Sequence, residues 1–209
     1  MVWAARRGHS HRLLVPHRPK GDLVGLDEDS HWELLHQCLK DTVLPLDVRA
    51  AGAILLLFGR HLARIAALPT TALTEVNSHP VLVLARTPIR LPEPAALLLT
   101  EFAAQAPSSG WAANSPRRWL FPGNRPGQHL SGSALARRLA ARHIPVRPAR
   151  TTALVQLTED LPPAVLAPLF GLHVVTAEQW RRRAATDWAA CLEARDTAPQ
   201  QPAHRLGPL

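Results

Sequence analysis

Proline recurs along most of this chain and divides it into short segments. The sequence has 20 prolines among 209 residues, and a proline inside a helix removes a backbone hydrogen bond and breaks or kinks that helix. The longest apolar run, Ala50–Phe58, falls well short of the about 20 residues that a membrane-spanning helix needs. We therefore expect short elements packed around a core, and no membrane as a partner.

Composition indicates a globular chain that folds in a reducing compartment. Hydrophobic residues make up 46% of the sequence and charged residues 19%, and a chain of this length buries enough apolar surface to fold without cross-links. The two cysteines, Cys38 and Cys191, form neither a disulfide framework nor a four-thiolate zinc site. This usage is typical of the cytoplasm, where we expect the protein to act.

Apolar periodicity predicts a mainly α-helical fold with one small antiparallel β-hairpin. The run Val81–Leu84 has the period of a strand, and Thr87–Leu91 is expected to pair with it as an edge strand because it contains Pro88. A helix near 47–58 is expected to end at Gly59. The other helices are expected at about 27–40, 61–68, 95–104, 131–143, 161–170 and 176–193, with one more that has Pro148 in its first turn.

The two ends of the chain differ from the middle. Before the first acidic residue, Asp22, there are five basic residues, and prolines with a glycine interrupt any long helix there. After Asp196 there are three prolines. We therefore expect a flexible basic arm over 1–25, one domain over 26–195 and a disordered tail over 196–209.

Positive charge is concentrated in one stretch that lacks acidic residues. The net charge is +8, and arginine supplies all the basic residues except Lys20 and Lys40. Arginine binds phosphate oxygens in pairs, and unrelieved positive charge attracts polyanions. Double-stranded DNA is the expected partner; a solvated basic face without a ligand is the alternative. Between Phe102 and Thr158 the arginines are Arg117, Arg118, Arg125, Arg137, Arg138, Arg142, Arg147 and Arg150.

Motifs for nucleotide, hydride or metal chemistry are absent from the sequence. It contains no GxxxxGK[ST] loop, no GxGxxG after a strand, no HExxH and no GxSxG. It also contains no tyrosine, so no tyrosyl group of this chain acts as a nucleophile. The sequence predicts no cofactor and no metal site.

Five short segments follow one another in a recognisable order. They are Leu55–Ile65, Val81–Pro92, Trp119–Pro122, Arg147–Thr151 and Leu169–His173. Their order and spacing resemble the catalytic domain of the tyrosine recombinases, the phage-integrase family, over about Leu46 to Arg195. The resemblance makes 26–195 an integrase-like catalytic domain.

The resemblance implies the chemistry of DNA breaking and rejoining. In that family a tyrosine attacks a DNA phosphate and forms a covalent phosphotyrosine. Two arginines bind the non-bridging oxygens on which charge develops, and a histidine or lysine handles protons. Neither a metal nor a nucleotide is required. The implied roles are DNA recombination and DNA integration.

The family's catalytic positions are only partly kept. His61 stands at the place of the first arginine, and a shift of one residue would recruit Arg60 instead. Arg86 is the basic residue nearest to the family's hairpin lysine. In the His-x-x-Arg box, Arg147 occupies the position of the histidine and Arg150 occupies the position of the arginine. His173 lies one place beyond the box histidine. The candidate catalytic positions are therefore Arg150, Arg147, His61, Arg86 and His173.

Because the chain has no tyrosine, we expect a pseudoenzyme that does not cleave DNA alone. Cleavage would need a nucleophile from a second copy or from another recombinase chain, so such chains are possible partners. Contacts to the DNA backbone, which position a protein rather than specify a sequence, are expected from Arg117, Arg118, Arg137, Arg138, Arg150 and Arg181.

Two other interpretations of the sequence remain open. Residues 165–183 fit a helix-turn-helix, in which Gly171 makes the turn and Arg181 to Arg183 lie on the recognition helix of a transcriptional regulator. In the second, the arginines are all solvated and the chain is an interaction module that does not bind DNA. DNA binding that weakens with salt would exclude the second, because phosphate contacts release counterions.

Overall fold

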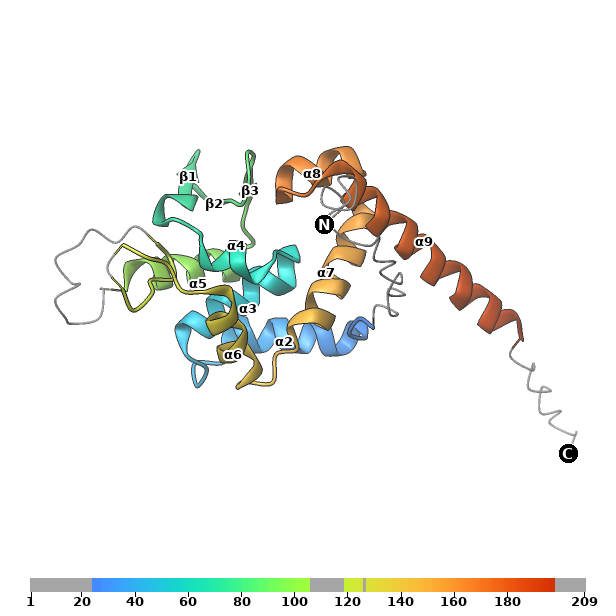
Figure 1. The fold of residues 1–209 in the computed structure, drawn as a ribbon, viewed down its shortest axis with the longest axis horizontal. Helices are drawn as coiled ribbons and strands as arrows, with labels where there is room; N and C mark the ends of the chain where they lie inside the picture. Colours follow the sequence, from blue (N-terminus) through green and yellow to red (C-terminus); the bar gives the residue numbers. More distant parts are fainter. Residues whose placement is uncertain (1–23, 106–118, 126, 198–209) are drawn as a thin grey trace, which may run out of the picture.

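Helices of 5 to 24 residues pack around one buried helix. The computed structural model describes residues 24–105, 119–125 and 127–197, and side chains up to residue 185 (Figure 1). The predicted mainly α-helical fold is confirmed over these residues. The helices are α2 (Glu28–Lys40), α3 (Leu46–Phe58), α4 (Leu62–Ala66), α5 (Glu93–Ala104), α6 (Gly132–Ala140), α7 (Val146–Asp160), α8 (Pro163–Phe170) and α9 (Val174–Thr197).

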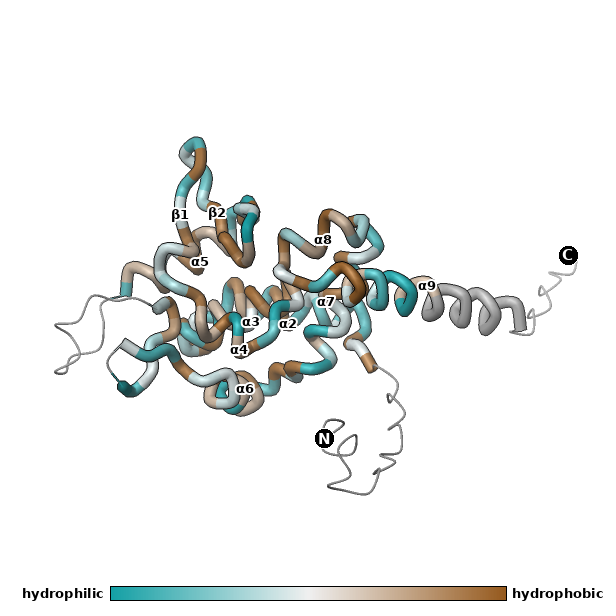
Figure 2. Tube along the Cα trace, turned by 45° about the horizontal axis from the view of Figure 1, so that its top comes forward, coloured by the Kyte–Doolittle hydropathy of each residue, from teal (hydrophilic) through white to brown (hydrophobic). Residues whose placement is uncertain are grey.

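Helix α3 is the centre of the core. Ten of its 13 residues are buried, and it packs against α2, α4, α5, α6 and α7. Hydrophobic positions gather along it in Figure 2. The apolar run is therefore a buried core helix, which is the usual fate of a run of this length. Gly52 allows α2 to come close, because an added Cβ would lie 2.5 Å from Sγ of Cys38.

Polar side chains fix the ends of these helices. Asp27 accepts a hydrogen bond from the amide of Ser30 at 2.9 Å and caps α2. The buried Arg49 of α3 donates to the carbonyl oxygens of Cys38 and Leu39 at the other end of α2. Ser131 caps α6 in the same way as Asp27 caps α2. Each bond satisfies a backbone group that a helix end leaves unpaired.

The small antiparallel sheet has three strands rather than the predicted two. Strands β1 (Leu73–Val76), β2 (His79–Val83) and β3 (Pro88–Arg90) pair in chain order. Strand β1 was not predicted. Asn77 and Ser78 have positive φ angles of 51° and 61°, as in the two-residue turns that join the strands of a hairpin. Pro88 lies in an edge strand, as predicted.

Helices α7, α8 and α9 form one side of the molecule. Helix α7 packs on both α3 and α9, and α8 packs on α9. The C-terminal part of α9 extends away from the other helices (Figure 1). Thr152 of α7 exchanges two hydrogen bonds with the backbone of Leu26 and so fastens the segment before α2 to this side.

The predicted arm and tail lie almost entirely outside the described residues. Residues 1–23 and 198–209 are not described, and neither are Arg117 and Arg118. Helix α9 continues to Thr197, four residues beyond the predicted end. In the described part of the chain, no helix combines the length and the apolar character that crossing a bilayer would require.

Candidate functional site

Two glycines in the left-handed conformation position Arg60. Gly59 (φ 56°) ends α3, as predicted, and Gly171 (φ 63°) ends α8. A Cβ on Gly59 would lie 2.6 Å from Cγ of Leu154 and 3.3 Å from the carbonyl oxygen of Arg150. A Cβ on Gly171 would lie 2.8 Å from Nη1 of Arg60. The missing side chains therefore let the α3–α4 turn approach α7 and let the Arg60 guanidinium reach the end of α8.

The Arg60 side chain lies at the C-terminus of α8. Its Nη1 donates a hydrogen bond to the carbonyl oxygen of Phe170, where the unpaired carbonyls and the helix dipole favour a cation. Its Nε is buried and has no hydrogen-bond partner in the described part of the chain. Burial, and to a lesser extent the charge of Arg64, lower the pKa of Arg60.

Arg150 reaches the same place from α7. It is half-buried, and its Nε is also buried without a hydrogen-bond partner. Its guanidinium carbon lies 5.9 Å from the ring centroid of the buried Trp180, and that of Arg183 lies 5.2 Å from the same ring. Burial lowers the pKa of Arg150. Arginine nevertheless stays protonated at neutral pH, so two desolvated cations remain at this site.

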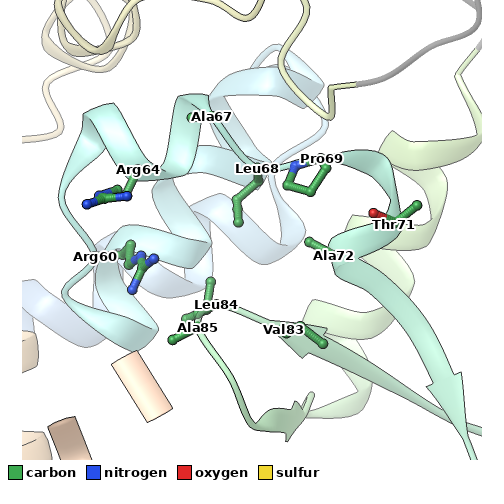
Figure 3. Close-up of a pocket in the computed structure, with 10 residues that line it drawn as sticks. All are labelled: Arg60, Arg64, Ala67, Leu68, Pro69, Thr71, Ala72, Val83, Leu84 and Ala85. Atoms are coloured by element: carbon green, nitrogen blue, oxygen red, sulfur yellow. The ribbon is translucent and has the colours of Figure 1, made fainter. Parts of the chain in front are cut away.

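Three cavities meet at these two arginines. The smallest, about 150 Å³, is lined by Arg60, His61, Arg64 and Arg150 together with the α3–α4 and α8–α9 turns. A second, about 330 Å³, shares Arg60 and Arg64 with it. In Figure 3 these two side chains lie at one end of that cavity, and Val83 of β2 with Leu84 and Ala85, which follow it, lie along one side.

The third cavity, about 630 Å³, lies between α4, α6, α7 and α9 and shares His61 and Arg150 with the smallest. Together the three cavities form what we call the arginine groove. None of the described residues that line it is acidic.

The arginine groove has the properties of an anion site. Buried polar atoms are nearly always hydrogen-bonded, yet among the described residues neither Nε atom has a partner and no carboxylate lines the groove. A phosphate would supply both the charge and the acceptors, since a guanidinium binds phosphate oxygens with two parallel hydrogen bonds. Among the described residues, no group of three His, Cys, Asp or Glu side chains is placed to hold a metal ion.

The structure brings some of the predicted catalytic positions together. Arg150, Arg147 and His61 line the groove. His61 is exposed, and its Nδ1 accepts a hydrogen bond from the amide of Ala63 at the start of α4. Arg86 and His173 are exposed and line none of the three cavities, and Nδ1 of His173 accepts from the amide of Val175. The side chain that lines the smallest cavity together with Arg150 is Arg60, which lies one residue before His61, the position that the resemblance favours for the first arginine.

The predicted DNA-backbone contacts are spread over other surfaces. Arg137 and Arg138 of α6 are exposed, and Arg138 forms an ion pair with Asp47 of α3. Arg181 is exposed on α9. Arg64, which was not among the predicted contacts, lines two of the cavities. The signal for Arg60 is Gly59, because the left-handed glycine directly before it sets the direction in which the chain leaves α3.

Comparison with known proteins supports the fold. No protein-family model matches the chain, and neither does any curated protein. Among solved structures, the crystal structure of the XerA recombinase is similar with a TM-score of 0.58 and 17% identity, over 85% of this chain and 66% of that one. The Tn1549 transposon integrase in complex with circular intermediate DNA is similar with a TM-score of 0.59 and 15% identity, over 93% of this chain and 75% of that one.

These similarities extend over most of the described chain. The fold is that of the recombinase and integrase structures, as the five sequence segments predict. The chain spans about two thirds of the length of the XerA recombinase structure.

Proposed function

We propose that this protein binds double-stranded DNA and holds a backbone phosphate between Arg60 and Arg150. The observation that carries the proposal is the pair of half-buried guanidiniums, each with an unpaired Nε, in a groove that no acidic side chain of the described residues lines. Keeping two desolvated cations close together costs stability. A bound anion that accepts hydrogen bonds from both offsets that cost.

A DNA backbone fits this site better than a small free anion. The groove extends from the sheet to α9 over three adjoining cavities, and exposed arginines lie on the surrounding helices α6 and α7. A polyanion can occupy such a surface at several points. In this proposal, residues 26–195 form the DNA-binding unit. The basic arm 1–25 adds DNA contacts that do not depend on the DNA sequence, and residues 196–209 take no part in binding. The protein is proposed to act in the cytoplasm.

The proposed protein binds DNA as a pseudoenzyme and does not cleave it alone. Phosphoryl transfer needs a nucleophile, and the family's nucleophile is a tyrosine, of which this chain has none. We infer that this DNA binding serves DNA recombination or integration. Either a second copy or another recombinase chain would have to supply the tyrosine for strand cleavage.

The test is a titration of labelled duplex and of the matching single strand at several salt concentrations. We expect tighter binding to the duplex and a linear fall of log K with log salt concentration. Incubation with nicked and intact duplexes should yield no covalent protein–DNA product. Absence of binding at low salt would overturn the proposal, and a covalent product would overturn the pseudoenzyme part of it.

The α8–α9 segment supports a second candidate, a helix-turn-helix regulator. Gly171 makes a left-handed turn between two helices, and Arg181 is exposed on the second. Changing Arg181 and Arg182 to glutamine separates the two candidates. The recombinase-like mode loses little affinity in that variant and much in Arg150→Gln, whereas a regulator shows the reverse and loses its preference for one sequence.

A further inference from the structure

The largest cavity of the groove is much larger than one phosphate needs. Its volume of about 630 Å³ is several times that of the cavity between Arg60 and Arg150. It is within the range of about 300–1,000 Å³ for sites that bind organic molecules. A phosphate fills only the smaller cavity, so the larger one is open to whatever is attached to that phosphate.

The lining of this cavity is mostly apolar, with polar groups that suit a heterocyclic ring. Leu62, Ala136 and Val146 supply aliphatic surface, and the ring of Trp180 forms part of the wall. Ser133 and Thr151 add hydroxyl groups, which both donate and accept hydrogen bonds. A flat ring with polar edges suits such a lining, because apolar side chains can contact the ring and the hydroxyl groups can bond its edge.

We propose that this cavity takes one unstacked nucleobase, next to the phosphate that Arg60 and Arg150 hold. The inference rests on the proposed function and names the preferred substrate, a duplex with an unpaired, extrahelical nucleotide. Proteins that bind a flipped base pay the cost of unstacking it, and this cost is lowest when the base is already unpaired.

Charge favours a nucleotide over an aromatic side chain of a partner protein. The cavity opens onto Arg150 and His61, which it shares with the phosphate cavity, and Arg147 lies on its wall. An occupant must therefore present a ring and a negative charge a few ångströms apart. A nucleotide has both, whereas a phenylalanine, tyrosine or tryptophan side chain would leave the arginines unpaired.

The experiment compares an intact duplex with the same duplex carrying a single bulged thymine. The wild-type protein should bind the bulged duplex about fivefold more tightly or better, the lower end of the effect measured for stacking one base on an aromatic side chain. The bulged thymine should also become protected from permanganate oxidation when the protein binds.

The variant Ala136→Phe fills the cavity without changing any charge. It should lose the preference for the bulge and leave the thymine reactive, with the affinity of the same variant for the intact duplex as the reference. Ala140→Phe is the matched control, since Ala140 is exposed one turn further along α6 and does not line the cavity. It should keep both the preference and the protection.

The outcomes separate this inference from the proposed function. If neither duplex binds, the proposed function fails. If both bind equally, or if Ala136→Phe keeps the preference and the protection, DNA binding stands and the base site is overturned. The base site is also overturned if sedimentation shows that Ala136→Phe dissociates a homodimer, because a second copy would then occupy the cavity.

Discussion

The arginines of the groove and those of the outer surface have the same charge and very different surroundings. Arg60 and Arg150 are half-buried, have lowered pKa values and keep an unpaired Nε. Arg137, Arg142 and Arg181 are exposed. A surface cation costs the fold almost nothing, whereas a desolvated one is a net cost until a partner binds it. Burial, rather than the number of charges, therefore marks where a ligand acts.

Removing the two buried cations should have the largest effect on DNA binding. The double variant Arg60→Gln/Arg150→Gln is expected to lose about 100-fold or more in affinity for duplex, since a hydrogen bond to a charged group contributes about 1.5–3 kcal/mol. The matched pair Arg137→Gln/Arg142→Gln removes the same charge from exposed positions of or next to α6 and should lose only a few-fold. Fluorescence anisotropy at fixed ionic strength measures both.

Equal losses in the two double variants would remove the distinction on which the candidate site rests. Binding would then depend on net charge alone. The slope of log K against log salt concentration gives an independent check, because each phosphate contact that is lost lowers the slope by about one.

Gly171 offers a way to displace one buried arginine without changing any charge. In Gly171→Ala the new Cβ would lie 2.8 Å from Nη1 of Arg60, the far end of a flexible side chain. The guanidinium should move out of line with the phosphate, and we expect affinity for duplex to fall about tenfold, comparable to losing one hydrogen bond with a charged partner.

Gly127→Ala is the matched control for this prediction. Gly127 also has a positive φ, 70°, but an added Cβ would meet nothing within 4 Å. Both variants carry the cost of a left-handed alanine, about 1–2 kcal/mol of unfolding free energy, which urea denaturation measures. Only Gly171→Ala should weaken binding, and a similar loss in Gly127→Ala would attribute the effect to backbone strain.

Local signals predicted most of the elements, because each depends on neighbouring residues. The apolar run of α3 and its stop at Gly59 can be read within a dozen residues. Strand β1 was missed, although Asn77-Ser78 is a turn signal, because its four residues alternate too briefly to give a clear period.

The candidate site could be predicted only in part. The sequence shows Arg150 and offers a choice between His61 and Arg60. The choice depends on how the chain leaves the left-handed Gly59 and on the position of Phe170, which is 110 residues away along the chain. Separating exposed from half-buried arginines likewise requires tertiary packing, since burial at positions such as 137 and 150 is set by distant helices.

Trp180 should contribute to DNA affinity through its contact with Arg150. The guanidinium lies over the ring at 5.9 Å, and such cation–π contacts contribute about 0.5–2 kcal/mol. Trp180→Leu should therefore weaken binding about fivefold by letting Arg150 move, while Trp180→Phe, which keeps an aromatic face, should retain most of the affinity. Anisotropy titrations well below the unfolding temperature separate this effect from the loss of core packing. Equal losses in the two variants would show that packing alone is involved.

The smallest expected effect is that of His31 on the pH dependence of stability. Its buried ring also contrasts with the two arginines of the groove. It is buried on α2, and its Nδ1 is unpaired like the two Nε atoms of the groove. Histidine, unlike arginine, can lose its charge. Burial lowers the pKa of His31 below its usual value of 6.5, and a hydrogen bond with the Leu56 backbone opposes this shift only in part. The folded protein therefore favours the neutral form of His31 more than the unfolded chain does.

The lowered pKa fixes the sign of the pH dependence. Below about pH 6.5 the unfolded chain binds a proton that the folded chain excludes, so the free energy of unfolding should decrease as the pH falls from 7 to 5, by at most about 1.4 kcal/mol per pH unit. Urea denaturation at pH 7, 6 and 5 measures the slope. His31→Phe should flatten it, and His36→Phe, at an exposed position of the same helix, should not. If His31→Phe keeps the slope, an unpaired buried nitrogen in this protein does not by itself mark an excluded charge. Only the lack of acidic side chains among the described residues of their cavity would then distinguish Arg60 and Arg150.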